Sequence, residues 1–170
     1  MSSKQISDYI VMDIPAGRVM ICLRPDLAPK AVERFQTLAM QGFYDKLAFH
    51  RVIDKFMAQG GDPTGTGMHG SDLPDLPAEF TYKEHFERGT IGMARTSDPH
   101  SANSQFFIMF EPAPHLDGQY TIVGKVIAGM EHVDKIKRGK GSSGVVTDPD
   151  RIITMRPATE EEIEEVVGKV

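Results

Sequence analysis

The stretch FHRVIDKFMAQGGD, residues 49–62, places a permanently charged arginine inside an apolar run that ends on two glycines and an aspartate. Such a run is typical of short strands and a turn. Side chains alternate along a strand, so Phe49, Arg51 and Ile53 would share one face. Arg51 is therefore either a surface arginine that extends to water, or a cation kept among apolar neighbours for binding or catalysis.

Similar strand-like runs occur on both sides of this stretch, separated by clusters of Gly, Pro, Asp and Asn that supply turns. Few helical patterns lie between them, so strand-helix-strand crossovers are not expected. An antiparallel sheet or barrel is favoured instead. The runs are DYIVMDI, RVMICL, AFHRVI, FMAQGG, TIGMAR, SQFFIMF, YTIVGKVI and RIITMR.

Three segments carry the apolar spacing of amphipathic helices, namely residues 28–43, 129–141 and 159–170. The first has a proline where an early turn tolerates it and Gly42 at its expected end. The second carries basic residues toward its C-terminal end, which complement the helix dipole.

The last of these segments, TEEEIEEVVGKV, begins with a capping-box pattern, because Thr159 is followed three residues later by Glu162. Its apolar stripe must be covered by something. Docking on the protein's own sheet, a dimer contact and a frayed tail all remain open. The stripe consists of Ile163, Val166, Val167 and Val170.

The length of the chain fits one domain. With 170 residues and 18.8 kDa it can bury a sizeable core. We expect a single domain over residues 1–170, with its core at about 10–156 and a C-terminal tail helix at about 159–168. Cys22 is the single cysteine, so it cannot form an intrachain disulfide, and its apolar setting predicts a buried thiol in a strand.

Charge and hydropathy exclude two classes of partner. A net charge of −5 and a pI near 5.7 disfavour nucleic acid, whose phosphates call for clustered Lys and Arg. No run approaches the ~20 apolar residues of a membrane span, and the first residues lack the pattern of a signal peptide. We therefore expect a cytoplasmic protein with no membrane contact.

Common catalytic motifs are missing from the sequence. The six histidines show no helical i, i+4 pair, so no metal is expected. Ser101 and Ser104 do not sit in a G-x-S-x-G elbow. The stretch GDPTGTGMHG, residues 61–70, lacks the G-K-[ST] ending of a phosphate loop. What remains is one fixed cation, several large apolar side chains, two glutamines and a glycine-rich backbone, a set that suits non-covalent recognition of a peptide.

Three motifs in order, FHRVIDKFMAQGGD, GTIGMARTSDPHSANSQFFI and PHLDGQYTIVGKVIAGM, give the sequence a specific resemblance. From about residue 10 to residue 138 it resembles the cyclophilins, the peptidyl-prolyl cis/trans isomerases. The resemblance implies a mainly β fold, a closed eight-stranded antiparallel β-barrel capped by two helices. The short C-terminal helix is read from the residues themselves.

Carried over residue by residue, the resemblance makes Arg51 the catalytic residue. It implies an apolar proline pocket, two polar anchors for the peptide and a backbone segment that binds the residue before proline. It also implies a neighbouring glycine-rich loop around Gly65 and Gly67. The pocket residues are Phe56, Met57, Phe107 and Leu116, the anchors are Gln59 and Gln105, and the backbone segment is Ala94, Arg95 and Thr96.

The sequence departs from the family pattern at three of its substrate-binding positions. His115 stands where many cyclophilins have a tryptophan, and Tyr120 where they have a pocket histidine. Arg95 replaces an asparagine that is common in eukaryotic members. The tryptophan contacts the drug cyclosporin in the family, so cyclosporin is expected as a ligand whose binding is weakened by His115.

The implied function is isomerisation of X-Pro peptide bonds, which assists protein folding by non-covalent stabilisation of the twisted amide. It needs no cofactor and no metal. The expected partners are proline-containing peptides and unfolded or folding proteins. A monomer is expected, and an oligomeric scaffold that uses the tail helix is a rival reading. The main alternative is a proline-peptide binding module or chaperone with incidental turnover.

Overall fold

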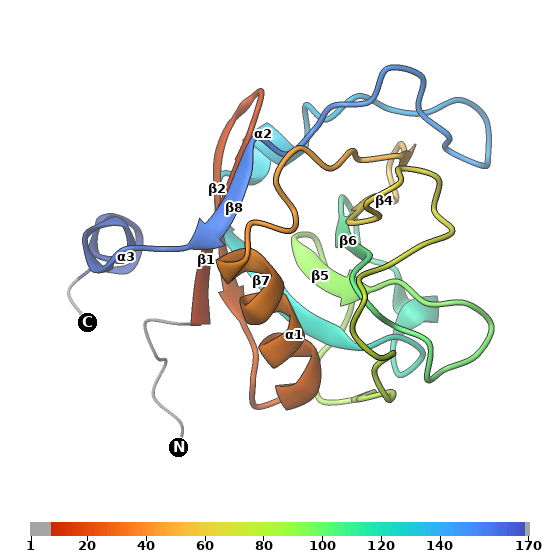
Figure 1. Cartoon of the computed structure of the whole chain (residues 1–170), viewed down its shortest axis with the longest axis horizontal. Coiled ribbons are helices and arrows are strands. Elements are labelled where there is room, and N and C mark those ends of the chain that lie inside the picture. Colours follow the sequence, from red (N-terminus) through yellow and green to blue (C-terminus); the bar gives the residue numbers. More distant parts are fainter. Residues whose placement is uncertain (1–7, 169–170) are drawn as a thin grey trace.

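The computed structural model describes residues 8–168, in which eight short strands form one antiparallel sheet (Figure 1). Most strands are four to seven residues long, as the short apolar runs predict. The strands are β1 Tyr9–Ile14, β2 Gly17–Leu23, β3 Arg51–Ile53, β4 Met57–Gly60, β5 Thr90–Met93, β6 Phe106–Met109, β7 Ile122–Ala128 and β8 Thr154–Pro157.

The strands follow the order β3-β4-β6-β5-β7-β2-β1-β8, so β3 and β8 are the two ends of the sheet. The segment that precedes β3 is hydrogen-bonded to the segment that precedes β8. The N–H of Lys46 donates to the carbonyl of Ile152 at 2.7 Å, and Ile152 donates to Leu47 at 2.8 Å. The mainly β class and the eight-stranded antiparallel sheet are confirmed. Complete closure into a barrel by regular strand pairing is not established.

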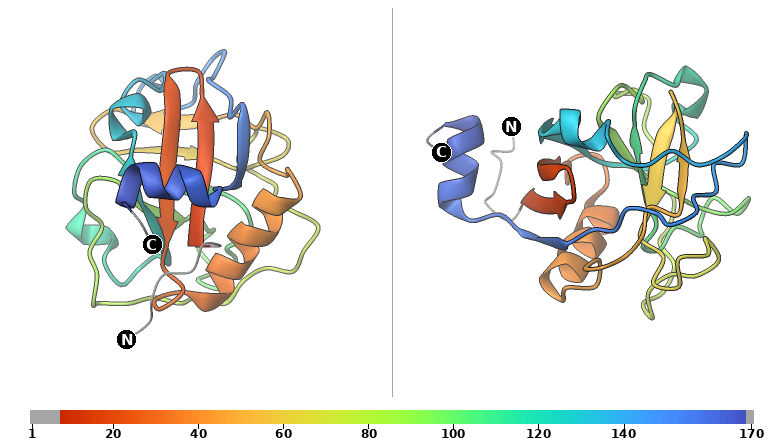
Figure 2. Two further views of the ribbon diagram at one scale, coloured as in Figure 1. Left: turned by 90° about the vertical axis from the view of Figure 1, so that its left-hand side faces the viewer. Right: turned by 90° about the horizontal axis from the view of Figure 1, so that it is seen from above.

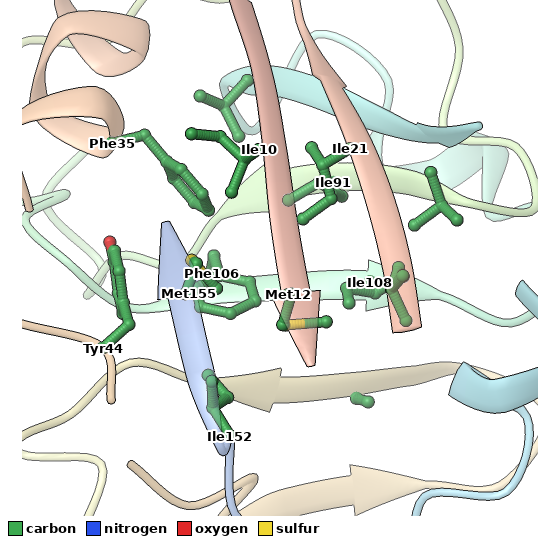
Figure 3. Close-up of a cluster of buried hydrophobic side chains, with 14 of the residues drawn as sticks. Ile10, Met12, Ile21, Phe35, Tyr44, Ile91, Phe106, Ile108, Ile152 and Met155 are labelled. Atoms are coloured by element: carbon green, nitrogen blue, oxygen red, sulfur yellow. The ribbon is translucent and has the colours of Figure 1, made fainter. Parts of the chain in front are cut away.

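The main core lies between the sheet and helix α1, Pro29–Met40. Its helical spacing turns one apolar face inward, and α1 packs against β7 and β8. Phe35 of this helix meets Tyr44 at 5.2 Å and Phe106 at 5.4 Å between ring centroids (Figure 3). The helix therefore closes the core from one side and leaves the other face of β4 and β6 for other contacts.

Helix α2, Met130–Val133, is shorter than the segment 129–141 predicted from apolar spacing. Of the three apolar positions at helical spacing, Val133 and Ile136 are buried, and Met130 is partly buried against the main core. The regular helix stops after one turn because the next backbone bonds, from Lys135 to His132 and from Ile136 to Val133, span three residues rather than four.

Helix α3, Glu160–Val167, lies across the outer face of β1 and β2 (Figure 2). The predicted capping box is present: the N–H of Glu162 donates to Thr159 Oγ1 at 3.1 Å, and the N–H of Thr159 donates to Glu162 Oε1 at 2.8 Å. Ile163 is fully buried against the outer side of the sheet. Docking on the protein's own sheet is therefore confirmed for this residue.

The rest of the predicted stripe on α3 is not covered. Val166 and Val167 are exposed, and Val170 lies outside the described residues. Cys22 lies in β2 as predicted but is half-buried rather than buried. It faces outward and packs beside the small cluster that Ile163 completes, which shields it only in part. No helix within residues 8–168 has the length and apolar character to cross a membrane.

Candidate active site

Strands β3, β4 and β6 lie side by side, and their register aligns three predicted functional residues. Arg51 pairs with Gln59, and Gln59 pairs with Phe107. Directly paired residues in a sheet point to the same face, so a cation, an amide and an aromatic ring form one row. The β3–β4 hairpin that sets this register turns through Lys55, whose φ is +63°.

The predicted alternation around Arg51 is wrong for Phe49. Phe49 lies in the main core together with Val52, so it does not share a face with Arg51. Regular β3 begins only at Arg51, and the N–H of Phe49 instead bonds the carbonyl of Asp150. Ile53 does pack on the side of the candidate site, as the alternation from Arg51 predicts.

A chain of hydrogen bonds begins at the Arg51 guanidinium. Arg51 Nη1 donates to Gln59 Oε1 at 3.2 Å, Gln59 Nε2 donates to Gln105 Oε1 at 2.9 Å, and Gln105 Nε2 donates to the carbonyl of His69 at 2.9 Å. Each amide oxygen faces a donor and each amide nitrogen faces an acceptor. The two glutamines are therefore fixed in a single orientation.

The guanidinium has a second anchor, because Arg51 Nε donates to the carbonyl of Ser143 at 2.9 Å. A guanidinium has five N–H donors, and these two bonds use two of them. Within residues 8–168 the other three have no protein acceptor. Arg51 is half-buried, so these donors are held in place and remain open to a bound molecule.

A cavity of about 330 Å³ opens beside Arg51 and has an apolar floor. Phe107 is 5 % exposed and stands edge-on to the Tyr120 ring at 5.6 Å. Phe86 stacks behind Phe107 at 5.7 Å. The cavity is lined by Arg51, Phe56, Met57, Gln59, Ala94, Arg95, Phe107, His115, Leu116 and Tyr120, all of them predicted site residues.

One glycine permits this aromatic stack. Gly92 on β5 pairs with Phe107, and a Cβ at Gly92 would lie 2.4 Å from the Phe107 ring and 2.7 Å from that of Phe86. Sequence reasoning missed Phe86 and Gly92. The glycine within the strand-like run TIGMAR was the available signal, because a strand glycine often marks a close approach of other groups.

The rim of the cavity is formed by the short 3-10 helix η2, Pro114–Leu116. His115 stacks on Phe56 with centroids 5.9 Å apart. Asp117, at the end of η2, accepts from the N–H of Phe86 at 2.8 Å and bonds His85 Nδ1 at 2.7 Å. The carboxylate of Asp117 raises the pKa of His85 by hydrogen bonding and charge. These contacts tie η2, and with it the cavity rim, to the segment that carries Phe86.

Arg95 supports the cavity wall with its side chain. Its guanidinium lies 4.6 Å from the Tyr120 ring centroid and donates twice to the carbonyl of Gln119 and once, at 2.8 Å, to that of Thr96. The resemblance assigned only the backbone of this segment to substrate. In the structure the Arg95 side chain also contacts the Tyr120 ring. The arginine that replaces the family's asparagine therefore helps to hold Tyr120 in the cavity wall.

A second cavity, of about 630 Å³, adjoins the first. Gln59, Ala94 and Arg95 border both cavities, so the two form one continuous groove. Gln105 and Thr96 line only the second cavity, which separates them from the apolar floor. Gly67 lines it too, and both Gly65 and Gly67 line a third cavity of about 570 Å³ that Arg51 also borders.

The glycine-rich loop beside the second cavity is organised by Asp62, a fully buried carboxylate. It accepts from the N–H groups of Thr64, Gly67 and His69 at 2.7, 2.6 and 3.1 Å. Burial alone would raise its pKa, but these bonds hold the pKa of Asp62 at about 2. The loop thus presents the His69 carbonyl that ends the chain of hydrogen bonds from Arg51, a role that sequence reasoning missed.

Metal chemistry has no obvious ligand set here. Among residues 8–168 no group of three or more His, Cys, Asp and Glu side chains is placed to hold a metal ion. The arrangement instead combines a fixed cation, an apolar cavity and a polar groove, which can bind an extended peptide with one apolar side chain inserted beside a guanidinium.

Comparison with known proteins points the same way. The family model for cyclophilin type peptidyl-prolyl cis-trans isomerase/CLD matches residues 9–157. A probable peptidyl-prolyl cis-trans isomerase of Brucella suis is 52% identical, with 89% of this chain and 83% of that protein covered. The peptidyl-prolyl cis-trans isomerase-like 1 of Gibberella zeae is 38% identical, with 90% and 96% covered.

Solved structures agree with the family match. A cyclophilin type peptidyl-prolyl cis-trans isomerase of Cryptosporidium parvum, crystallised in the presence of the dipeptide Ala-Pro, has a TM-score of 0.81 at 30% identity, and the match covers 89% of this chain and 99% of that one. Helix α3 follows the end of the family match. The chain belongs to the cyclophilin-type peptidyl-prolyl cis-trans isomerases.

Proposed function

We propose that this isomerase holds the proline ring of its substrate in the 330 Å³ cavity and directs the Arg51 guanidinium at the prolyl nitrogen. One observation carries the proposal. Arg51 is fixed by Gln59 and Ser143 through two N–H groups, and it keeps three more at the mouth of a cavity floored by Phe107.

The chemistry required at such a site is the loss of amide resonance. Rotation about an X-Pro bond meets a barrier of ~18 to 20 kcal/mol because the nitrogen lone pair is delocalised into the carbonyl. In the twisted state the lone pair is localised on nitrogen and can accept a hydrogen bond. A guanidinium placed there stabilises the twisted state more than the planar one, which is the condition for catalysis.

The apolar floor contributes in a second way. A twisted amide is less polar than a planar one, so a site with little water favours it further. Met57, Phe107 and Leu116 are all buried and present only apolar surface to the ring. No proton transfer and no covalent intermediate are needed in this mechanism.

The flanking peptide would lie along the second cavity. Gln59 and Gln105 are already oriented by the chain of hydrogen bonds, and the backbone from Ala94 to Thr96 borders the groove. If these groups hold one side of the peptide while the other side rotates, the geometry for rotation is set before the barrier is reached. The same groove would let the protein hold a proline-containing segment without turnover.

The Ala-Pro dipeptide present with the Cryptosporidium parvum relative supports proline-containing peptides as substrates. We propose unfolded or folding proteins as the source of such peptides. We propose weak cyclosporin binding because of His115, a monomeric state and a cytoplasmic location. We also propose that the segments 46–49 and 150–152 complete a closed barrel.

A direct test compares wild type with Arg51→Ala on a short X-Pro peptide in a protease-coupled assay. We expect the variant to lose at least about 100-fold in kcat/KM, since it removes a group that acts mainly on the twisted state. Arg18→Ala is the control, because Arg18 lies on the outer face of the sheet beside α3, where it bonds Glu162. Equal rates for wild type and Arg51→Ala would refute the proposed role.

The same variant separates catalysis from holding. If Arg51→Ala loses its rate but still delays aggregation of an unfolding protein as wild type does, the holding function is separable from turnover. If both activities fall together, holding depends on Arg51 as turnover does.

A further inference from the structure

The segment formed by residues 139–146 lies along the outer edge of β3, the strand that carries Arg51. We propose that the Ser143–Gly144 unit of this segment is a positioning element for Arg51. Its Ser143 carbonyl fixes the guanidinium plane from the side opposite Gln59. This inference rests on the proposed role of Arg51 in the reaction.

The Ser143 carbonyl is held in place by backbone bonds on the residues that flank Arg51. The N–H of Val52 donates to the carbonyl of Gly144 at 2.8 Å, and the N–H of Gly139 donates to the carbonyl of Val52 at 2.8 Å. The N–H of Val146 bonds the carbonyl of His50 at 3.1 Å. A carbonyl one residue away from such bonds moves only if the segment leaves β3.

Two glycines make this close approach possible. Gly144 is buried with φ +73°, and a Cβ there would lie 2.5 Å from Ile53 Cγ1 and 3.1 Å from the Val52 carbonyl oxygen. At Gly139 a Cβ would lie 1.9 Å from the carbonyl oxygen of Gly144. A side chain at either position forces the segment away from β3 and carries the Ser143 carbonyl with it.

The same turn contains a glycine without this function. Gly141 has φ +66°, nearly the value of Gly144, but a Cβ there meets nothing within 4 Å. Alanine at Gly141 therefore carries the left-handed backbone cost alone, while alanine at Gly144 adds the collision with Ile53 and Val52. The two positions form a matched pair.

The consequence for catalysis lies in the orientation of one side chain. Arginine has many rotamers, so bonds at both Nε and Nη1 are needed to hold its plane. Ser143 and Gly144 line neither the proline cavity nor the adjoining groove. Loss of the Nε bond should therefore lower kcat and leave KM nearly unchanged, because the surfaces that bind peptide stay intact.

The experiment measures kcat and KM on an X-Pro peptide for Gly144→Ala, Gly139→Ala and Gly141→Ala. We expect roughly tenfold lower kcat for the first two, with KM within about twofold of wild type, because a small misplacement of a catalytic group costs rate. Gly141→Ala should stay within about twofold of wild type in both constants. Equal rates for Gly144→Ala and Gly141→Ala would overturn the proposal.

A double-mutant cycle tests whether Gly144 acts through Arg51. In an Arg51→Lys background the Nε donor is gone, so adding Gly144→Ala should cause no further loss of rate. An additional tenfold loss would show that Gly144 acts by another route. If Arg51→Lys itself keeps the wild-type rate, the proposed role of Arg51 fails, and that result is distinct from a failure confined to Gly144.

The wild-type protein provides a measurement that does not depend on any variant folding well. The NMR signal of the Arg51 Nε–H group should exchange slowly with water, because it is bonded to the Ser143 carbonyl. It should keep this protection in Gly141→Ala and lose it in Gly144→Ala or Gly139→Ala. Rapid exchange in wild type would contradict the proposal directly.

Discussion

Phe106 and Phe107 are neighbours on β6 that lie in two different regions of the molecule. Phe106 is fully buried in the main core, with the Phe35 ring 5.4 Å away and the Tyr44 ring 5.5 Å away (Figure 3). Phe107 points to the opposite face, where it floors the cavity beside Arg51. The same residue type on one strand thus lies in the main core at one position and lines the candidate site at the next.

The difference follows from how each face is completed. The core face is covered by α1, and its aromatic rings are fully buried among other side chains. The cavity face has Phe86 behind Phe107 but leaves the front of the ring open, beside the polar row of Arg51 and Gln59. Side chains alternate along a strand, so β6 has one face in the core and the other in the site. Packing of the core face therefore also holds the site residues of the same strand in place.

The largest effect is expected from Phe106→Ala. Removing a fully buried ring should lower the free energy of unfolding by about 3–5 kcal/mol, as the surrounding core cannot refill the cavity. Urea denaturation at several temperatures measures this loss. The folded fraction should retain most of its kcat. A variant that keeps its stability but loses its rate would break the assignment of Phe106 to the core.

Phe107→Ala should give the opposite pattern. We expect kcat/KM to fall about 100-fold, roughly 2.7 kcal/mol of transition-state stabilisation, because the proline ring loses its main apolar contact. The loss in unfolding free energy should be smaller than for Phe106→Ala, since the new space opens to solvent. Paired urea and peptide assays decide the matter. If Phe107→Ala proves the less stable of the two variants, the contrast between the two faces is wrong.

Arg95→Lys sharpens the account of the cavity wall. Lysine cannot stack on Tyr120 and donate to the Gln119 and Thr96 carbonyls at once, so Tyr120 should become more mobile. We expect roughly tenfold lower kcat/KM with little change in stability, measured on the same peptide. Arg88→Lys, at an ion pair with Asp134, is the matched control. Equal activities for both variants would show that the wall needs no support from Arg95.

The smallest effect concerns the outer face, far from the cavity. Arg156 lowers the pKa of Glu162 to about 2 from its ordinary value of 4.5. A carboxylate with a depressed folded pKa adds stability above its unfolded pKa and loses it as pH falls through the folded value. Wild type should therefore lose stability between these two values, and Glu162→Gln should be about 1 kcal/mol less stable near neutral pH.

Denaturation of both proteins across the acid range measures the Glu162 contribution. The gap between wild type and Glu162→Gln should close on acidification, and the kcat of the two should match. Asp62, whose pKa is also held near 2, contributes equally to both proteins and cancels in the difference. A gap that is independent of pH would mean that the charge of Glu162 does not stabilise α3.

Much of the fold and of the candidate site could be predicted from the sequence, because these features depend on side-chain identity. The apolar spacing predicted α1, and the Thr159 capping box predicted the start of α3. The resemblance carried by the three motifs implied every residue that lines the 330 Å³ cavity. For the helices the signal lies in residue types at short spacing, and for the cavity it lies in the family resemblance.

Other features of the site could not be predicted, because they depend on backbone groups that come together only in the folded chain. The Ser143 carbonyl that fixes Arg51 comes from a residue 92 positions away and is a backbone group. The buried role of Asp62 depends on three N–H groups that converge only when the loop is folded. The alternation rule failed at Phe49 because it assumed that the strand began two residues earlier than it does.

We propose that a fixed Arg51 beside an apolar cavity lowers the rotational barrier of a bound X-Pro amide. Exchange NMR on a short X-Pro peptide tests it most directly, because it reports binding and on-enzyme interconversion separately. For Arg51→Lys we predict peptide affinity within about threefold of wild type and interconversion slowed by about 100-fold. Unchanged interconversion in Arg51→Lys, or a loss confined to affinity, would contradict the claim.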